Sequence, residues 1–170
     1  GYNQIEAYDL TAETSSSTIY ESGIDRLLAE VRPDGAVLFY HQDWLGNVAM
    51  LTNNIGVEVQ TYRYDVWGKA SGFDAAGSPI TTEAILSRFL FTGREYDPET
   101  GLYHYRARAY SGELGRFAQN DPIDFSAGDY NLYRYVANNP INLWDPLGLS
   151  PCDDFVDFLE QARPLIQSEA

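Results

Sequence analysis

The chain has 170 residues and a formal net charge of −14, with 11 Lys and Arg residues against 25 Asp and Glu residues. This balance argues against binding to nucleic acid or to an anionic membrane, because such surfaces are bound by basic residues that displace counterions. No apolar run approaches the roughly 20 residues that a membrane-spanning helix needs, so membrane insertion is not expected either.

The composition predicts one domain built from many short β-strands. Thirteen Tyr residues contribute to an aromatic content of 14%, and 14 Gly and 8 Pro residues supply frequent turns. Aromatic residues favour the pleated surface of a sheet. Residues 11–18 (TAETSSST) are polar and indicate a loop or a loosely held strand. Strands are then predicted at residues 27–31, 36–43, 48–52 and 57–64, with turns at 33–35, 45–47 and 53–56.

The segment 57–64 (VEVQTYRY) gives a clear strand signal, because its side chains alternate between two faces. One face carries Val57, Val59, Thr61 and Arg63, and the other carries Glu58, Gln60, Tyr62 and Tyr64. Residues 70–84 (ASGFDAAGSPITTEA) are rich in Gly, Ala and Ser and predict a surface loop or insertion, after which 86–93 (LSRFLFTG) predicts another strand. We therefore expect antiparallel strands with little helix over residues 27–117.

One short unit recurs along the chain: an aromatic residue lies near an Asp, and a Gly follows that Asp three or four residues later. The unit occurs at Asp43–Gly46, Asp65–Gly68, Asp97–Gly101 and Asp145–Gly148, and residues 110–115 (YSGELG) form a fifth copy with Ser in the Asp position. The pattern is typical of a hairpin turn, in which Asp accepts backbone N–H groups and Gly takes a positive φ. Such hairpins bury an apolar face only by stacking on neighbours.

Four segments carry a resemblance to a known family: TYRYDVWGK, FTGREYDPETGLYHYRARAY, GELGRFAQNDPI and NLYRYVANNPINLWDPLGL. They resemble the Rhs/YD-repeat proteins, specifically the Rhs repeat-associated core domain, over residues 24–149. In that family YD repeats coil into a spiralled β-sheet shell that encloses a polymorphic C-terminal toxin. The resemblance therefore implies a mainly β fold, an antiparallel β-hairpin spiral at the closing end of such a shell.

The resemblance also implies a self-cleavage site. In the family the core domain ends in a DPxGL motif, and an aspartyl autoprotease cuts directly after the Leu of that motif. The motif is present here as Asp145-Pro146-Leu147-Gly148-Leu149, so the implied scissile bond is Leu149–Ser150. The family's pair of acids falls on Asp121 and Asp145, and a supporting Arg falls on Arg108.

Two carboxylates supply the groups that peptide hydrolysis needs. One is ionised and takes a proton from water, while the other is protonated and hydrogen-bonds the scissile carbonyl. Two carboxyls that share a site separate in pKa, because both do not easily ionise together. Asp121 and Asp145 lie far apart in the sequence, so only folding brings them together. Arg108 would hold one carboxylate or polarise the carbonyl.

The same residues also fit purely structural roles. Asp97, Asp121 and Asp145 all precede Pro, as turn acids commonly do, and Arg108 alternates with Arg106 as a solvated strand residue would. Two alternatives to self-cleavage therefore stay open. One is a non-cleaving structural or interaction module, and the other is a carbohydrate-binding YD-repeat module that uses exposed Tyr and Trp.

No metal or other cofactor is expected from the sequence. Cys152 is the only Cys, so an internal disulfide is excluded. Together with His41 and His104 it offers little material for a zinc site or a Cys-His pair.

The segment after Leu149 reads as the start of a short C-terminal helix, with Ser150 as N-cap and Pro151 at the first helical position. We therefore divide the chain into a core domain, residues 1–149, and the start of a C-terminal cargo or toxin segment, residues 150–170. The expected partners are that segment, an upstream Rhs shell that the chain does not include, and secretion or delivery proteins. The expected location is that of a secreted or cell-surface-delivered bacterial protein, although no signal peptide opens the chain.

Overall fold

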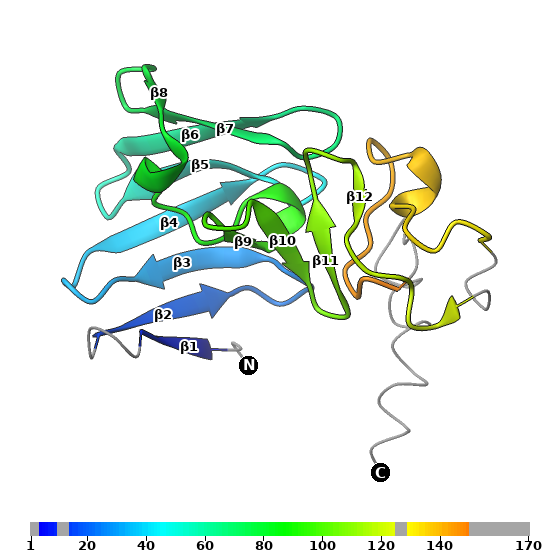
Figure 1. The fold of residues 1–170 in the computed structure, drawn as a ribbon. Helices are drawn as coiled ribbons and strands as arrows, with labels where there is room; N and C mark the ends of the chain where they lie inside the picture. Colours follow the sequence, from blue (N-terminus) through cyan, green and yellow to red (C-terminus); the bar gives the residue numbers. More distant parts are fainter. Residues whose placement is uncertain (1–3, 10–13, 125–128, 150–170) are drawn as a thin grey trace, which may run out of the picture.

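Eight strands form one antiparallel sheet in the computed structural model, which describes residues 4–9, 14–124 and 129–149. The strands are β1 (Gln4–Asp9), β2 (Thr14–Tyr20), β3 (Leu27–Val31), β4 (Val37–Gln42), β5 (Val48–Asn53), β6 (Glu58–Tyr64), β7 (Ala70–Asp74) and β8 (Pro79–Ile80). Their order in space follows their order in sequence, so each hairpin adds the next strand to the edge (Figure 1). The mainly β, antiparallel fold class predicted from the sequence is confirmed.

A second, four-stranded antiparallel sheet follows, in the order β12-β11-β10-β9. Its strands are β9 (Glu95–Asp97), β10 (Leu102–Tyr105), β11 (Arg108–Ser111) and β12 (Arg116–Phe117). Short 3-10 turns include η1 (Thr82–Ala84), η2 (Phe91–Gly93) and η4 (Val136–Asn138). Beyond β12 the segment that ends at Leu149 wraps back beside the small sheet (Figure 1). The helix predicted after Pro151 lies outside the described residues.

No helix in the part of the chain that the structure describes is long and apolar enough to cross a bilayer.

The core lies between the two sheets and is rich in Tyr. Tyr103, Tyr105 and Tyr110 of the small sheet and Tyr135 are almost completely buried, at 0–1% exposure. Their hydroxyl groups have partners: Tyr103 donates to the Gly68 carbonyl at 2.7 Å, and the Tyr105 hydroxyl lies 2.6 Å from that of Thr92. The unusual Tyr content therefore serves a packed interior in which each ring adds apolar area and each hydroxyl is satisfied.

The buried phenols predict a loss of stability at alkaline pH. Burial raises the pKa of Tyr64, Tyr103 and Tyr105 well above the ordinary value, whereas an unfolded chain releases these protons at about pH 10. The folded chain then holds more protons than the unfolded chain. The contribution of these phenols to the free energy of unfolding is therefore fully present below about pH 10 and is lost as the pH rises above it. Urea midpoints measured across that pH range check this, and phenolate absorbance that appears before unfolding would contradict it.

The recurring turn unit has one hydrogen-bonding pattern. In the β6–β7 turn the Oδ1 atom of Asp65 accepts the N–H groups of Trp67 and Lys69, each at 2.9 Å, and Gly68 takes a φ of 89°. The same pattern recurs in the turns headed by Asp43, Asn53 and Asp74. Ser111, the residue in the Asp position of the fifth copy, accepts the Leu114 N–H at 3.2 Å. The prediction of hairpin turns is confirmed for the copies at 43–46, 65–68, 97–101 and 110–115, which join neighbouring strands, whereas the copy at 145–148 joins no two strands in the described chain.

Two local predictions are wrong. The segment 70–84 is not simply a surface loop, because β7 pairs along its length with β6, and Asp74 heads a further turn unit that leads into β8. Residues 86–93 do not form a strand. Phe89, Leu90 and Phe91 are buried in the core, and Thr92 takes a φ of 48°, which a strand does not allow. This apolar run crosses between the sheets and fills the space between them.

Candidate functional site

The DPLGL motif, residues 145–149, folds as another copy of the turn unit. The Gly148 N–H donates to the Asp145 carbonyl at 3.3 Å, and the Leu149 N–H donates to Oδ1 of Asp145 at 3.0 Å. Asp121 heads a similar turn, in which Oδ1 accepts the Ile123 N–H at 3.0 Å. Both candidate acids therefore have one oxygen committed to a turn, and each has a second oxygen left for other contacts.

Arg108 brings the two acids together. Its Nη1 atom lies 2.9 Å from Oδ2 of Asp121, and its Nη2 atom lies 3.3 Å from Oδ2 of Asp145. The side chains are almost completely buried, with 2% exposure for Arg108, 6% for Asp121 and 2% for Asp145. The guanidinium also lies over the ring of Phe117, with 3.6 Å from Cζ to the ring centroid. Arg108 starts β11, so the small sheet fixes its position.

The Arg108 guanidinium also binds the main chain of the motif. Its Nε atom donates to the Gly148 carbonyl at 2.6 Å, and Nη1 donates to the Leu132 carbonyl at 3.2 Å. A single side chain thus links both candidate acids to the carbonyl one residue before Leu149. This fork of donors is a geometry that Arg supplies and Lys does not.

The cluster has one buried cation for two carboxylates. Burial lowers the pKa of Arg108 below its ordinary value, and the nearby charges of Asp121 and Asp145 oppose that shift. Arg108 still keeps its proton at any ordinary pH, because a guanidinium is not deprotonated in proteins. One cation balances one carboxylate only, so the cluster carries a surplus negative charge when both acids are ionised.

Three consecutive residues bind three consecutive carbonyls of the motif. Arg106 donates from its side chain to the Pro146 carbonyl, the Ala107 N–H donates to the Leu147 carbonyl at 3.2 Å, and Arg108 reaches the carbonyl of the next residue, Gly148. Residues 106 and 107 form the turn between β10 and β11. The end of the described chain is therefore aligned, residue by residue, along this turn.

Gly148 is required by close packing, which leads to a prediction. A Cβ atom at Gly148 would overlap the Tyr105 carbonyl oxygen, and Gly148 has a φ of 68°. Gly77 has a similar φ of 77°, but a Cβ atom there would meet nothing within 4 Å. We expect Gly148→Ala to lower the thermal midpoint clearly more than Gly77→Ala, because only the first adds a steric clash to the shared backbone strain. Equal shifts in differential scanning calorimetry would contradict this interpretation.

The structure brings together Arg108, Asp121 and Asp145, the three residues that the family resemblance singled out. The Leu149 N–H donates a hydrogen bond to Asp145, which holds Leu149 beside the acid pair. Ser150 lies outside the described residues. The catalytic role of the three stays a prediction.

Three further residues that hold the motif were missed by sequence reasoning. Arg94 and the backbone of Ala107 bind its carbonyls, and Asp25 holds Arg94. Arg106 was noticed only for its alternation with Arg108. No local pattern marks these residues, since their contacts depend on the packing of distant segments.

Comparisons with known proteins relate the chain to segments of much longer proteins. A tRNA3(Ser)-specific nuclease WapA of Bacillus spizizenii is 33% identical over 144 residues, which is 83% of this chain and 6% of the nuclease. Double-stranded DNA deaminase toxin A of Burkholderia cenocepacia is 32% identical over 114 residues, which is 67% of this chain and 8% of the toxin. No family model matches the chain.

A solved structure shares the fold. The crystal structure of TcdB2-TccC3-Cdc42 superimposes with a TM-score of 0.59 at 26% identity, covering 87% of this chain and 6% of that chain. Together with the two sequence relatives, this match shows that the chain is homologous to a small segment within large, toxin-related proteins.

Proposed function

We propose that this chain is an Rhs repeat-associated core domain that cleaves itself after Leu149. In this proposal residues 1–149 form the core domain, and residues 150–170 begin a C-terminal cargo that the cut releases. The relatives include a nuclease and a DNA deaminase toxin, which supports a cargo of toxin type. Arg108, Asp121 and Asp145 would carry the reaction, and Pro146, Leu147 and Gly148 would position the Leu149–Ser150 bond.

One observation carries the proposal. Two buried carboxylates share a single guanidinium that also binds the carbonyl of Gly148, directly before the residue whose bond would be cut. A structural turn needs no second buried acid on the same Arg, and the surplus acid is costly unless it is protonated. A pair of acids with one shared proton is the arrangement that aspartic peptidases use.

In this proposal the two acids share the steps of one hydrolysis. The ionised acid takes a proton from a water molecule, and the oxygen of that water attacks the Leu149 carbonyl carbon. The protonated acid donates to the carbonyl oxygen while the tetrahedral intermediate forms. Collapse of the intermediate breaks the C–N bond, and the nitrogen of Ser150 takes a proton as it leaves. The products are the Leu149 carboxylate and the Ser150 amine.

Mass spectrometry of the purified full chain tests the proposal directly. Self-cleavage produces one fragment ending at Leu149 and one beginning at Ser150, without any added protease. A chain that stays intact through prolonged incubation, in a context that includes the upstream shell, would exclude self-cleavage.

A non-cleaving structural module is the second candidate, and one observation favours it. The Oδ1 atom of Asp145 accepts the Leu149 N–H, just as Asp65 accepts the Lys69 N–H in a turn to which no chemistry is assigned. A carbohydrate-binding module has weaker support, because many of the Tyr rings are in the core. Retention on a glycan array would favour it.

The proposed partners follow from the same assignment. The core domain would hold its own cargo segment, contact an upstream Rhs shell and meet secretion or delivery proteins on its way out of a bacterial cell. Secretion, or delivery to the surface of another cell, is therefore the proposed destination, and binding to nucleic acid is not proposed for this chain with its charge of −14.

A further inference from the structure

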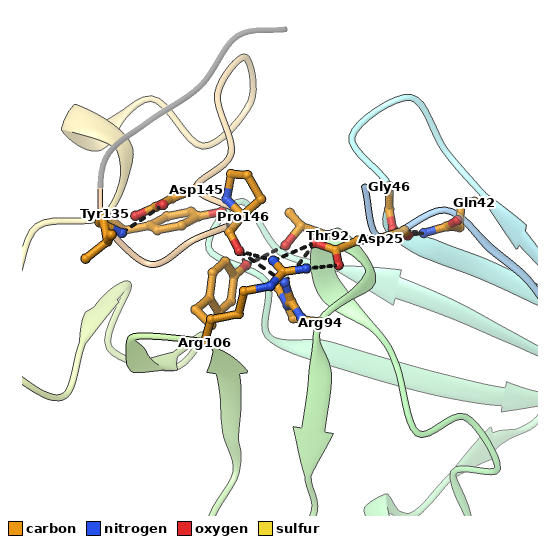
Figure 2. A network of polar contacts seen from close by, with 11 residues as sticks. Asp25, Gln42, Gly46, Thr92, Arg94, Arg106, Tyr135, Asp145 and Pro146 are labelled. Atoms are coloured by element: carbon orange, nitrogen blue, oxygen red, sulfur yellow. Dashed lines mark hydrogen bonds and ion pairs between the residues drawn. The ribbon is translucent and has the colours of Figure 1, made fainter. Parts of the chain in front are cut away.

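A second charged cluster contacts the motif, away from the two candidate acids. It consists of Asp25, in the loop between β2 and β3, together with Arg94 and Arg106 (Figure 2). Nη1 of Arg94 lies 2.8 Å from Oδ2 of Asp25, and Arg106 binds the same carboxylate with both Nη atoms, at 2.7 and 3.2 Å. The side chains of Asp25 and Arg94 are 12% and 9% exposed, so their charge-assisted contact is shielded from water, whereas the Arg106 side chain is 41% exposed.

Both arginines also bind the backbone of the motif. Nη1 of Arg94 donates to the Pro146 carbonyl at 3.2 Å, and Nη1 of Arg106 donates to the same oxygen (Figure 2). Pro146 is less than 2% exposed, so its carbonyl depends on partners inside the protein. Two charged donors on one carbonyl exceed what a simple turn requires.

The charges of the two clusters are complementary. Arg94 and Arg106 face one carboxylate, which leaves a surplus of one positive charge beside Pro146. Arg108 faces two carboxylates, Asp121 and Asp145, which leaves a surplus negative charge when both are ionised. With both acids ionised, the peptide that joins Asp145 to Pro146 runs between surplus charges of opposite sign.

The backbone that holds the second cluster is strained. Asp25 has a φ of 52° and Arg106 a φ of 53°, a region that residues other than Gly seldom adopt. The Asp25 carbonyl accepts a hydrogen bond from Nε2 of Gln42 at 3.0 Å, and the same amide donates to the Gly46 carbonyl at 2.7 Å (Figure 2). Such strain persists where surrounding contacts over-determine the conformation, and it is concentrated at sites of function.

We propose that Asp25, Arg94 and Arg106 form a latch, a positioning cluster that fixes the Pro146 carbonyl. Arg108 and the Ala107 N–H hold the next two carbonyls, so loss of the latch would free one end of the motif. The latch thereby positions Leu149 relative to the acid pair. Its effect on a cleavage rate rests on the proposed function, whereas its effect on docking of the motif does not.

The first test compares cleavage rates in the full chain. Arg94→Gln and Arg106→Gln each remove a charge and a donor to Pro146, and we expect each to slow cleavage by about 10- to 100-fold, the penalty for a misplaced reacting group. Arg106→Lys keeps the positive charge but loses the planar set of guanidinium donors. Its cleavage rate should lie between those of Arg106→Gln and the native chain. The matched control is Arg88→Gln, which breaks the partly exposed 2.7 Å ion pair with Glu95 and should leave the rate unchanged.

The second test measures docking without relying on cleavage. In an Asp121→Asn background, hydrogen exchange of the Gly148 and Leu149 amides should quicken when Arg94 or Arg106 becomes Gln. The Lys69 amide, bound in a separate turn, should exchange at an unchanged rate. If the native chain never cuts itself but the Gly148 and Leu149 amides exchange faster in the Gln variants, the proposed function fails and the latch is supported. Unchanged exchange overturns the latch, whether or not cleavage slows.

Discussion

Asp121→Asn and Asp145→Asn are each expected to yield a folded chain that is not cut. Asn neither takes up nor releases a proton, but its Oδ1 atom still accepts the turn hydrogen bond. The chain contains a precedent, because Asn53 heads a turn unit and accepts the Ile55 and Val57 N–H groups at 3.1 and 3.0 Å. Either substitution also leaves Arg108 with one carboxylate, so the buried charges balance.

The expected size of the effect is large. Loss of one member of a catalytic unit commonly removes most of the rate, so we expect cleavage to slow by about 10³-fold or more. Intact-mass measurements over a time course, with circular dichroism to verify the fold, provide the comparison. If the native chain is cut after Leu149 and Asp121→Asn is cut equally fast, the acid-pair mechanism is wrong although the processing is real.

Asp97→Asn is the matched control for both substitutions. Asp97 also precedes a Pro and heads a turn, in which Oδ1 accepts the Glu99 N–H at 2.9 Å, but it is exposed and belongs to β9. Cleavage after Leu149 should therefore persist in this variant. Asp-Pro bonds can also break chemically in acid. Fragment masses distinguish the two processes, because acid breakage falls between Asp145 and Pro146, whereas self-cleavage falls after Leu149.

Arg108→Ala is expected to lower the free energy of unfolding by about 3–5 kcal/mol, the usual cost of removing one partner from a buried ionic group. It leaves two buried carboxylates without their cation and removes the donor from the Gly148 carbonyl. Urea unfolding gives the measurement. Cleavage should also slow, without necessarily stopping, because Arg108 positions and stabilises but does not transfer the proton.

A partly exposed ion pair elsewhere in the chain is the matched control for Arg108→Ala. Arg134→Ala, which breaks a partly exposed pair with Asp129, should lower the free energy of unfolding far less than Arg108→Ala, because solvent screens such a pair. Similar losses in the two variants would show that the Arg108 cluster contributes no more than a surface pair.

The sequence predicted the hairpins well where local chemistry decides them. The strand predicted at 27–31 coincides with β3, because its flanking turns are marked by Pro and Gly. The error at 70–84 came from composition, since Gly and Ser lower the strand signal while pairing with β6 supplies the hydrogen bonds. Asp74 and Gly77 did carry the turn signature there, so that signal was present and unused.

The site was less accessible to sequence reasoning than the fold. Arg108, Asp121 and Asp145 stood out only through the family resemblance, because nothing local distinguishes two of 25 acids. Asp25 and Arg94 could not be found in that way, since the chain of contacts from Asp25 through Arg94 to Pro146 joins segments from opposite ends of the sequence. Such contacts are a property of the folded packing rather than of any short pattern.

Two residues of the motif are defined by the atoms they lack. Pro146 has no N–H, and the turn units use the N–H groups two and four residues after their Asp, so the first position needs none. Gly148 has no Cβ, where one would overlap a carbonyl oxygen. Apart from the Asp145 carboxylate, which Arg108 binds, the polar contacts described above are made to main-chain carbonyls and to the Leu149 N–H. Recognition of this kind needs no side chain from beyond Leu149, so the same closing motif can precede segments of quite different sequence.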